Sequence, residues 1–184
     1  MKLMIASDIH GSLHFCEKMC RAYEREHANR LLLLGDLLYH GPRNDLPNGY
    51  QPKEVIRLLN SLKRDILCVR GNCEAEVDQM VLEFPCLTES FALLLDGHAA
   101  YAAHGHHLDT ITPLLRSGDA LIYGHTHVPV MQVDEASGVL FLNPGSVSLP
   151  KEGSEHSYII YEDNLFSRRD LDGNLLGEIA FPML

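Results

Sequence analysis

Short apolar runs alternate with helix-like patterns over the first two thirds of the chain. Runs at residues 3–7, 31–34 and 66–69 are typical of buried strands. Around them, apolar residues recur three and four positions apart, as on a helix with one buried face. These sets are Phe15, Cys16, Met19, Cys20 and Tyr23; Val55, Ile56, Leu58, Leu59 and Leu62, behind Pro52 at a helix start; and Val77, Met80, Val81 and Phe84. The alternation predicts βα units.

Beyond residue 90 the pattern changes to strands joined by short turns. Runs at 91–95 and 99–103 flank Asp96-Gly97-His98, and Asp-Gly is a strong hairpin signal. Further hairpin-like runs follow at 128–133 and 139–142, and then a meander at 157–161, 165–171 and 175–181. We therefore expect an α/β (α+β) fold, a four-layer α/β/β/α sandwich of two mixed sheets flanked by helices, in one domain over residues 1–184.

Composition narrows the classes of function. With 25 acidic against 15 basic residues and a formal charge of −10, stable nucleic-acid binding is not expected, because such binding depends on cationic side chains. The five cysteines include no C-x-x-C pair, so neither a zinc knuckle nor a disulfide framework is indicated. No apolar run reaches membrane-spanning length. We expect a soluble, cytoplasmic protein without a membrane partner.

Five polar blocks follow predicted strands and contain side chains that bind metals. In open α/β folds, ligands bind where strands end, so these blocks should meet at one edge of a sheet. Oxygen and imidazole donors without thiolate suit divalent Mn, Fe, Zn or Mg. The blocks are Asp8-Ile9-His10, Gly35-Asp36, Gly71-Asn72-Cys73-Glu74, His104-Gly105-His106 and Gly124-His125-Thr126-His127.

The donors are too numerous for one ion. A single zinc needs three or four ligands, which leaves Asp36 and Asn72 unexplained. If the two oxygens of Asp36 are shared, two ions each receive a workable shell. Two cations about 3.5–4 Å apart clamp a bridging hydroxide and stabilise an in-line phosphoryl displacement. The expected metal ligands are Asp8, His10, Asp36, Asn72, His104, His125 and His127.

The five blocks, in this order, resemble those of the calcineurin-like metallophosphoesterase superfamily over residues 1–146. The segments 40–44, 71–74 and 143–146 are similar to those of the small YfcE-type bacterial phosphodiesterases. The resemblance implies the metallophosphoesterase fold and a dinuclear centre, commonly with Mn(2+), although Mg, Ni, Fe or Zn could also serve. It implies that Asp8, His10, Asp36 and His127 hold one ion, and that Asp36, Asn72, His104 and His125 hold the other.

Cys73 is a departure from the superfamily pattern. Many members have a histidine there that is thought to protonate the leaving group, and a thiol is a less versatile acid near neutrality. We therefore expect a metal-dependent phosphodiesterase acting on a small phosphoester, with Asp36, Asn72 and Cys73 as catalytic residues. Cys73 could instead be a buried packing residue. The alternatives are a phosphomonoesterase or nucleotide phosphatase, and a non-catalytic scaffold like the retromer subunit of this fold.

The long loop at 37–51 contains the candidate substrate contacts His40, Arg43 and Asn44. Arg43 could bind a phosphate oxygen, or it could be a solvated loop cation. Glu74 and Glu76 are expected to begin a helix, where carboxylates suit the positive end of the dipole. The apolar strands after residue 128 leave a homo-oligomer open.

Overall fold

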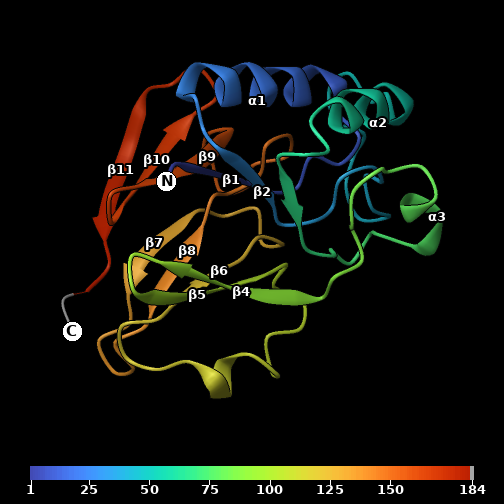
Figure 1. The fold of residues 1–184 in the computed structure, drawn as a ribbon. Coiled ribbons are helices and arrows are strands. Elements are labelled where there is room, and N and C mark those ends of the chain that lie inside the picture. Colours follow the sequence, from blue (N-terminus) through green and yellow to red (C-terminus); the bar gives the residue numbers. More distant parts are fainter. Residues whose placement is uncertain (183–184) are drawn as a thin grey trace.

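Two β-sheets pack face to face in the protein, which is described here over residues 1–182 from a computed structural model (Figure 1). The strand order of the first sheet is β11-β10-β9-β1-β2-β3, and that of the second is β4-β5-β6-β8-β7. The first sheet comprises β1 (Leu3–Ala6), β2 (Arg30–Leu33), β3 (Ile66–Cys68), β9 (Ser157–Glu162), β10 (Leu165–Asp170) and β11 (Leu175–Ala180). The second comprises β4 (Ser90–Leu95), β5 (His98–Ala103), β6 (Ala120–Ile122), β7 (Val130–Val133) and β8 (Leu140–Asn143).

Both sheets are mixed, and their parallel strands position the polar blocks. Strand β2 runs parallel to both β1 and β3, and β5 runs parallel to β6. Strand β6 also runs parallel to β8. The other pairs are antiparallel: β1 with β9, β9 with β10, β10 with β11, β4 with β5, and β7 with β8. Because parallel strands end at the same edge, the loops after β1, β2 and β3 lie together and face those after β5 and β6.

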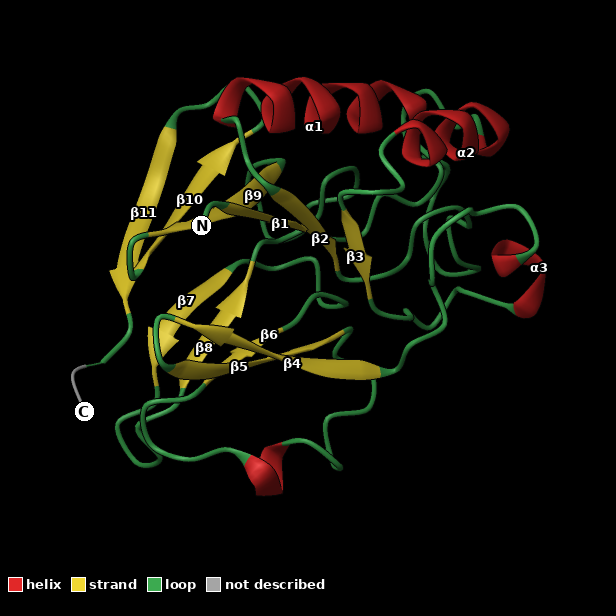
Figure 2. Ribbon diagram, in the orientation of Figure 1, coloured by secondary structure: helices red, strands yellow, loops and turns green. Residues whose placement is uncertain are grey.

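Two helices cover the outer face of the first sheet (Figure 2). Helix α1 (Leu13–Glu26) begins at Ser12, whose hydroxyl accepts a hydrogen bond from a backbone N–H of the first turn. Helix α2 (Pro52–Ser61) begins at a proline, which lacks the N–H that a helix start leaves unpaired. The predicted stripes are buried against the sheet, as Met19 and Leu59 illustrate.

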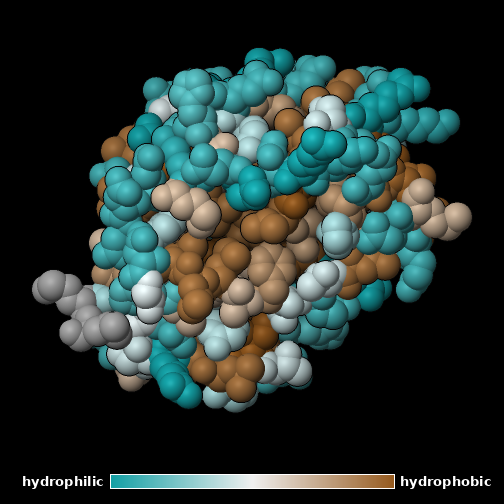
Figure 3. Space-filling view, in the orientation of Figure 1, coloured by the Kyte–Doolittle hydropathy of each residue, from teal (hydrophilic) through white to brown (hydrophobic). Residues whose placement is uncertain are grey.

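Strand β1 lies inside the molecule with both faces covered. Met4 faces the helical layer, whereas Leu3 and Ile5 face the second sheet. A strand buried on both sides needs a continuous apolar run, which explains why this segment lacks polar alternation. A space-filling view of the molecule in the orientation of Figure 1 shows apolar residues gathered in the middle of the visible surface, below hydrophilic residues of the helical layer (Figure 3).

The predicted four-layer sandwich is confirmed, although its helices are few. The outer face of the second sheet carries one 3-10 helix, η1 (Thr112–Leu114), near a small apolar cluster that includes Ile111 and Leu121. The expected short helix near residue 77 is the single turn α3 (Glu76–Gln79), and Met80 beside it is 83% exposed. Its apolar pattern therefore does not mark a buried helix face. Among residues 1–182, no helix is both long enough and apolar enough to cross a bilayer.

Candidate metal centre

The loops after β1 and β6 bring one group of donor atoms together. The Nε2 atoms of His10 and His127 lie 3.1 Å apart. Asp8 Oδ1 lies 3.5 Å from His10 Nε2 and 3.2 Å from His127 Nε2. All three residues are buried. Such spacing between acceptor atoms is typical of ligands that share a cation.

A second group forms beside the first. His104 follows β5, and its Nε2 lies 3.1 Å from Oδ1 of Asn72, which follows β3. Nδ1 of His125 lies 3.3 Å from the same His104 nitrogen. An amide oxygen and two imidazoles thus converge on one point.

The carboxylate of Asp36 lies between the two groups. Its Oδ2 is 3.6 Å from His10 Nε2, and its Oδ1 is 3.6 Å from His104 Nε2. One oxygen therefore faces each group, as a carboxylate that bridges two cations must. The structure brings together all seven residues that the sequence identified as expected ligands.

Backbone carbonyls orient three of the imidazoles. The Nδ1 atoms of His10, His104 and His127 lie within 2.7 Å of carbonyl oxygens. A carbonyl only accepts, so each Nδ1 carries a proton and donates it, which leaves Nε2 as the nitrogen that faces the centre. The three carbonyls belong to Tyr39, Leu34 and Leu149 respectively.

Asp8 has one satisfied oxygen and one that lacks a hydrogen-bond donor. Its Oδ2 accepts from Ser7 Oγ at 2.6 Å and from the backbone N–H of His125 at 3.1 Å. Its Oδ1 is buried and has no hydrogen-bond partner among residues 1–182. A buried carboxylate oxygen without a donor is costly unless a cation lies beside it. The residues present therefore fit a metal ion at the first group.

Backbone strain is concentrated at the expected ligands. Five of the seven have φ in the left-handed region, between 49° and 66°. Non-glycine residues adopt this region rarely, and strained conformations cluster where function needs a particular side-chain direction. The five are Asp8, His10, Asp36, His125 and His127.

The two carboxylates stay ionised inside the protein. Burial opposes ionisation of Asp36, but the hydrogen bond and positive charge of His104 outweigh it and hold the carboxyl pKa below its usual range. Asp8 is also buried, but the neighbouring imidazoles of His10 and His127 outweigh burial and lower its pKa in the same way. Burial likewise disfavours the charged form of His104, yet the bond to Asp36 and the charges of both carboxylates raise its pKa to about 9. The centre strongly favours positive charge.

Glu74 is part of the site, and its expected role at a helix start is wrong. The side chain is buried and accepts hydrogen bonds from the backbone N–H groups of Asp36, Leu37 and Gly71. Burial raises its pKa to about 7, with the charge of Asp36 acting in the same direction and the three N–H donors opposing. In the sequence, the single indication of this role is that Glu74 is the fourth residue of the 71–74 block.

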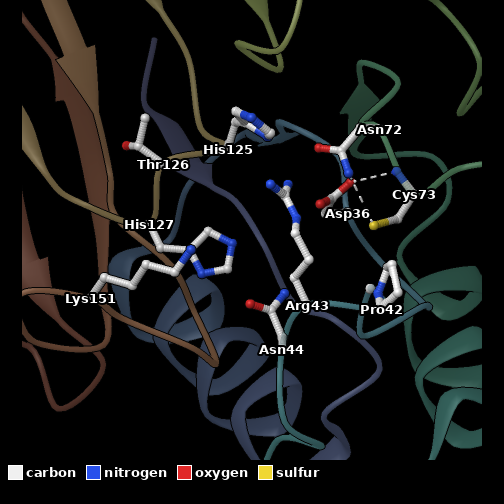
Figure 4. Close-up of a pocket in the computed structure, with 11 residues that line it drawn as sticks. Asp36, Pro42, Arg43, Asn44, Asn72, Cys73, His125, Thr126, His127 and Lys151 are labelled. Atoms are coloured by element: carbon white, nitrogen blue, oxygen red, sulfur yellow. Dashed lines mark hydrogen bonds between the residues drawn. The ribbon is translucent and has the colours of Figure 1, made fainter.

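A cavity of about 370 Å³ opens over the centre (Figure 4). The guanidinium of Arg43 points into it between His127 on one side and Asn72 on the other. Lys151 and Thr126 line the cavity on the His127 side, and sequence reasoning had identified neither. The lining consists of Asp36, Gly41, Pro42, Arg43, Asn44, Asn72, Cys73, His125, Thr126, His127 and Lys151.

The other expected substrate contacts differ in position. His40 does not line the cavity, and its ring packs against Tyr39 and Tyr50 instead, so the geometry does not support its expected contact. Asn44 does line the cavity, while its Nδ2 donates to the carbonyl of His40 at 2.8 Å and steadies the loop.

Cys73 lies at the cavity wall, and its backbone N–H donates to Asp36 Oδ1 at 2.9 Å. Burial raises the pKa of its thiol, and the nearby charge of Asp36 adds to the effect, so the thiol keeps its proton. The position favours a role in the site over simple core packing.

This fold and these strand-end ligands define a class of enzyme. Residues 1–164 match the family model described as "Calcineurin-like phosphoesterase superfamily domain". The chain belongs to this superfamily and is a metallophosphoesterase, an enzyme that hydrolyses phosphoesters. The resemblance found in the sequence is thereby confirmed.

Individual relatives are similar over nearly the whole chain. The chain is 42% identical over 182 residues to "Phosphodiesterase YfcE" of Escherichia coli (strain K12), covering 98% of each protein. It is 24% identical over 168 residues to "Probable metallophosphoesterase YsnB" of Bacillus subtilis (strain 168), covering 87% of the chain and 83% of that protein.

Solved structures share the fold. The structure of YfcE, a phosphoesterase from E. coli, superposes with a TM-score of 0.93 at 41% identity, over 99% of this chain and 100% of that one. Vps29 of Entamoeba histolytica complexed with zinc superposes with a TM-score of 0.66 at 21% identity, over 99% of this chain and 100% of that one. At that identity the likeness to Vps29 concerns the fold alone.

Proposed function

We propose that this chain is a metal-dependent phosphodiesterase that hydrolyses a small phosphoester at a dinuclear centre. The observation that carries the proposal is the carboxylate of Asp36, which presents one oxygen to each of two donor groups. The name of the similar E. coli protein, a phosphodiesterase, supports the reaction class.

The donor chemistry suggests how two ions would be held. Asp8, His10 and His127 would bind one ion with Asp36 Oδ2, and Asn72, His104 and His125 would bind the other with Asp36 Oδ1. Oxygen and imidazole ligands suit Mn(2+) first, with Mg, Ni, Fe or Zn as substitutes. When bound, such a pair supplies a bridging hydroxide as nucleophile and stabilises charge on the phosphoryl oxygens.

The protein's own residues position the substrate. Arg43 reaches into the cavity with a planar fork of N–H donors that matches two phosphate oxygens. Asn44 holds the loop that carries it. Together they orient the substrate in the cavity beside the metal-binding residues.

Cys73 disfavours substrates whose leaving group needs a proton. Its thiol has a raised pKa and is therefore a poor proton donor near neutrality. Esters with good leaving groups react without that proton, and we propose that such diesters are preferred to alkyl phosphomonoesters.

Paired assays on reconstituted protein test the proposal. Metal-free protein is loaded in turn with Mn, Mg, Ni, Fe and Zn, its metal content is measured, and bis(p-nitrophenyl) phosphate is compared with p-nitrophenyl phosphate. We expect two ions per chain and a higher kcat/KM for the diester. A preference for the monoester would instead indicate a phosphomonoesterase or nucleotide phosphatase, and failure to bind metal would indicate a scaffold.

A further inference from the structure

Two cationic side chains line the cavity without an acidic partner. Nine of the 15 lysines and arginines form ion pairs with carboxylates. Arg43 and Lys151 form none among residues 1–182, although the chain has 25 acidic residues. Asp36 is the only carboxylate among the described lining residues, and it belongs to the metal-binding set. The positive charge of both side chains is thus available to a ligand.

The chain segments that carry the two cations also contact metal-binding histidines through their backbone. The carbonyl of Tyr39, which orients His10, begins the loop that carries Arg43 four residues later. On the other wall, the carbonyl of Leu149 orients His127, and the backbone N–H of Lys151 donates to the carbonyl of His127 at 3.2 Å. The backbone that carries each cation therefore lies close to the centre, while both side chains are exposed.

Charge balance indicates what the two cations bind. Two divalent ions with Asp8 and Asp36 leave two surplus positive charges, which a singly charged phosphodiester and its attacking hydroxide already neutralise. Arg43 and Lys151 then remain as two further charges in a closely lined cavity. A terminal phosphate has a second pKa of about 6 and therefore carries close to two negative charges at neutral pH, which match the two positive charges of Arg43 and Lys151.

We propose that the natural substrate is a small phosphodiester that carries a second, terminal phosphate, and that Lys151 binds this phosphate together with Arg43. The inference rests on the proposed diesterase function. The cavity, at about 370 Å³, has room for a small molecule of this kind. Arg43 extends into the cavity from the loop between the two walls, while Lys151 lines it on the His127 side.

Matched substrates test the proposal. One is p-nitrophenyl hydroxypropyl phosphate, and the other is the same ester with a phosphate on its hydroxyl. For the Mn-loaded enzyme we expect the second ester to have a kcat/KM at least about tenfold higher, the effect of one charge-assisted contact. In Lys151→Gln, and separately in Arg43→Gln, most of this preference should be lost, whereas the ratio should stay unchanged in the exposed controls Lys53→Gln and Arg64→Gln.

A binding measurement gives a readout that does not depend on turnover. Calorimetry on the Mn-loaded protein compares propylene bisphosphonate with propylphosphonate, both inert to hydrolysis. We expect the bisphosphonate to bind at least about tenfold more tightly, and Lys151→Gln to remove most of this difference while the metal content stays at the wild-type value.

The two proposals fail in different ways. If neither ester is hydrolysed, the diesterase proposal is wrong. The second phosphate site is then decided by calorimetry, through the ratio of the affinities for the bisphosphonate and for propylphosphonate. Hydrolysis of both esters at equal kcat/KM would overturn the second phosphate site only. So would Lys151→Gln and Arg43→Gln variants that slow both esters to the same extent, because the cations would then serve only the scissile phosphate.

Discussion

Glu74 holds the loop of Asp36, because its Oε2 accepts a hydrogen bond from the backbone N–H of Asp36 at 2.9 Å. Its Oε1 accepts a second one from the backbone N–H of Leu37 at 2.7 Å. The strained backbone of Asp36 is thus secured by a buried carboxylate from a segment 38 residues away. The bridging role proposed for Asp36 depends on this partner.

Replacing Glu74 should loosen the metal centre. In Glu74→Gln the side-chain NH2 group faces backbone donors, so we expect metal affinity to fall about tenfold to a hundredfold, as it does when a group supporting a ligand is lost. Glu74→Ala should also lower the free energy of unfolding by about 2–4 kcal/mol, because buried N–H groups lose their acceptor. Metal titration and denaturant unfolding measure the two effects. Glu76→Gln, on the exposed first turn of α3, is the control, and unchanged affinity in Glu74→Gln would refute this role.

Asp36→Asn should remove activity with every ion. The amide retains the shape but loses the shared negative charge and one acceptor oxygen, so neither group keeps its full donor set. We expect the affinity for the metals to fall at least about a hundredfold. Metal content per chain, followed beside diesterase activity, is the measurement. The exposed Asp45→Asn variant of the long loop serves as control, and an active Asp36→Asn enzyme would contradict the bridging role.

Cys73→His should change the preference among substrates. An imidazole protonates a departing alkoxide near neutral pH, whereas this thiol has a raised pKa. We expect the ratio of monoesterase to diesterase kcat/KM to rise about tenfold or more. Cys73→Ser supplies the comparison, because serine keeps the size without adding an acid that works near neutrality. An unchanged ratio in Cys73→His would disprove the explanation.

Acid should weaken the fold through Glu26. Burial raises the pKa of this carboxyl, but hydrogen bonds from Tyr158 and Lys2 outweigh burial and keep the pKa below its ordinary value. A carboxyl whose pKa is lower in the folded state stabilises the fold above its unfolded pKa, and this contribution is lost as the pH falls through the folded pKa.

Denaturant unfolding of wild type and Glu26→Gln at a series of pH values tests this direction of the pH dependence of stability. The variant should be less stable than the wild type by about 1 kcal/mol at neutral pH, and the gap should close as the pH falls through the lowered pKa of Glu26 in the folded protein. Glu24→Gln, on the exposed face of α1, should show no such convergence. A gap that widened in acid would mean that the direction is wrong.

Sequence reasoning succeeded where a single local pattern decides the outcome. The continuous apolar run at Leu3–Ala6 predicted a strand buried on both faces, and parallel strands necessarily bring Asp8 and Asp36 to one edge. The two sheets together bring the seven expected ligands to this edge, and their binding of metal stays a prediction. The fold could therefore be predicted nearly whole.

Its failures have physical causes. Glu74 lies two residues before α3, where helix-end electrostatics explain a carboxylate as well as burial does, so its long-range acceptor role was hidden. Lys151 belongs to no motif, and only folding brings it beside Arg43. His40 was judged by its place in the loop, yet the aromatic rings of Tyr39 and Tyr50 hold it away from the cavity.

The left-handed backbone of five ligand residues has a consequence for the history of such folds. Each non-glycine residue held there destabilises the chain by about 1–2 kcal/mol relative to a relaxed alternative. Where catalysis is no longer selected, glycine or asparagine at these positions would raise thermal stability and erase the hydrolytic site in the same step. A descendant could then keep the sandwich and serve a purely architectural purpose, because none of the five residues belongs to the apolar clusters between the layers.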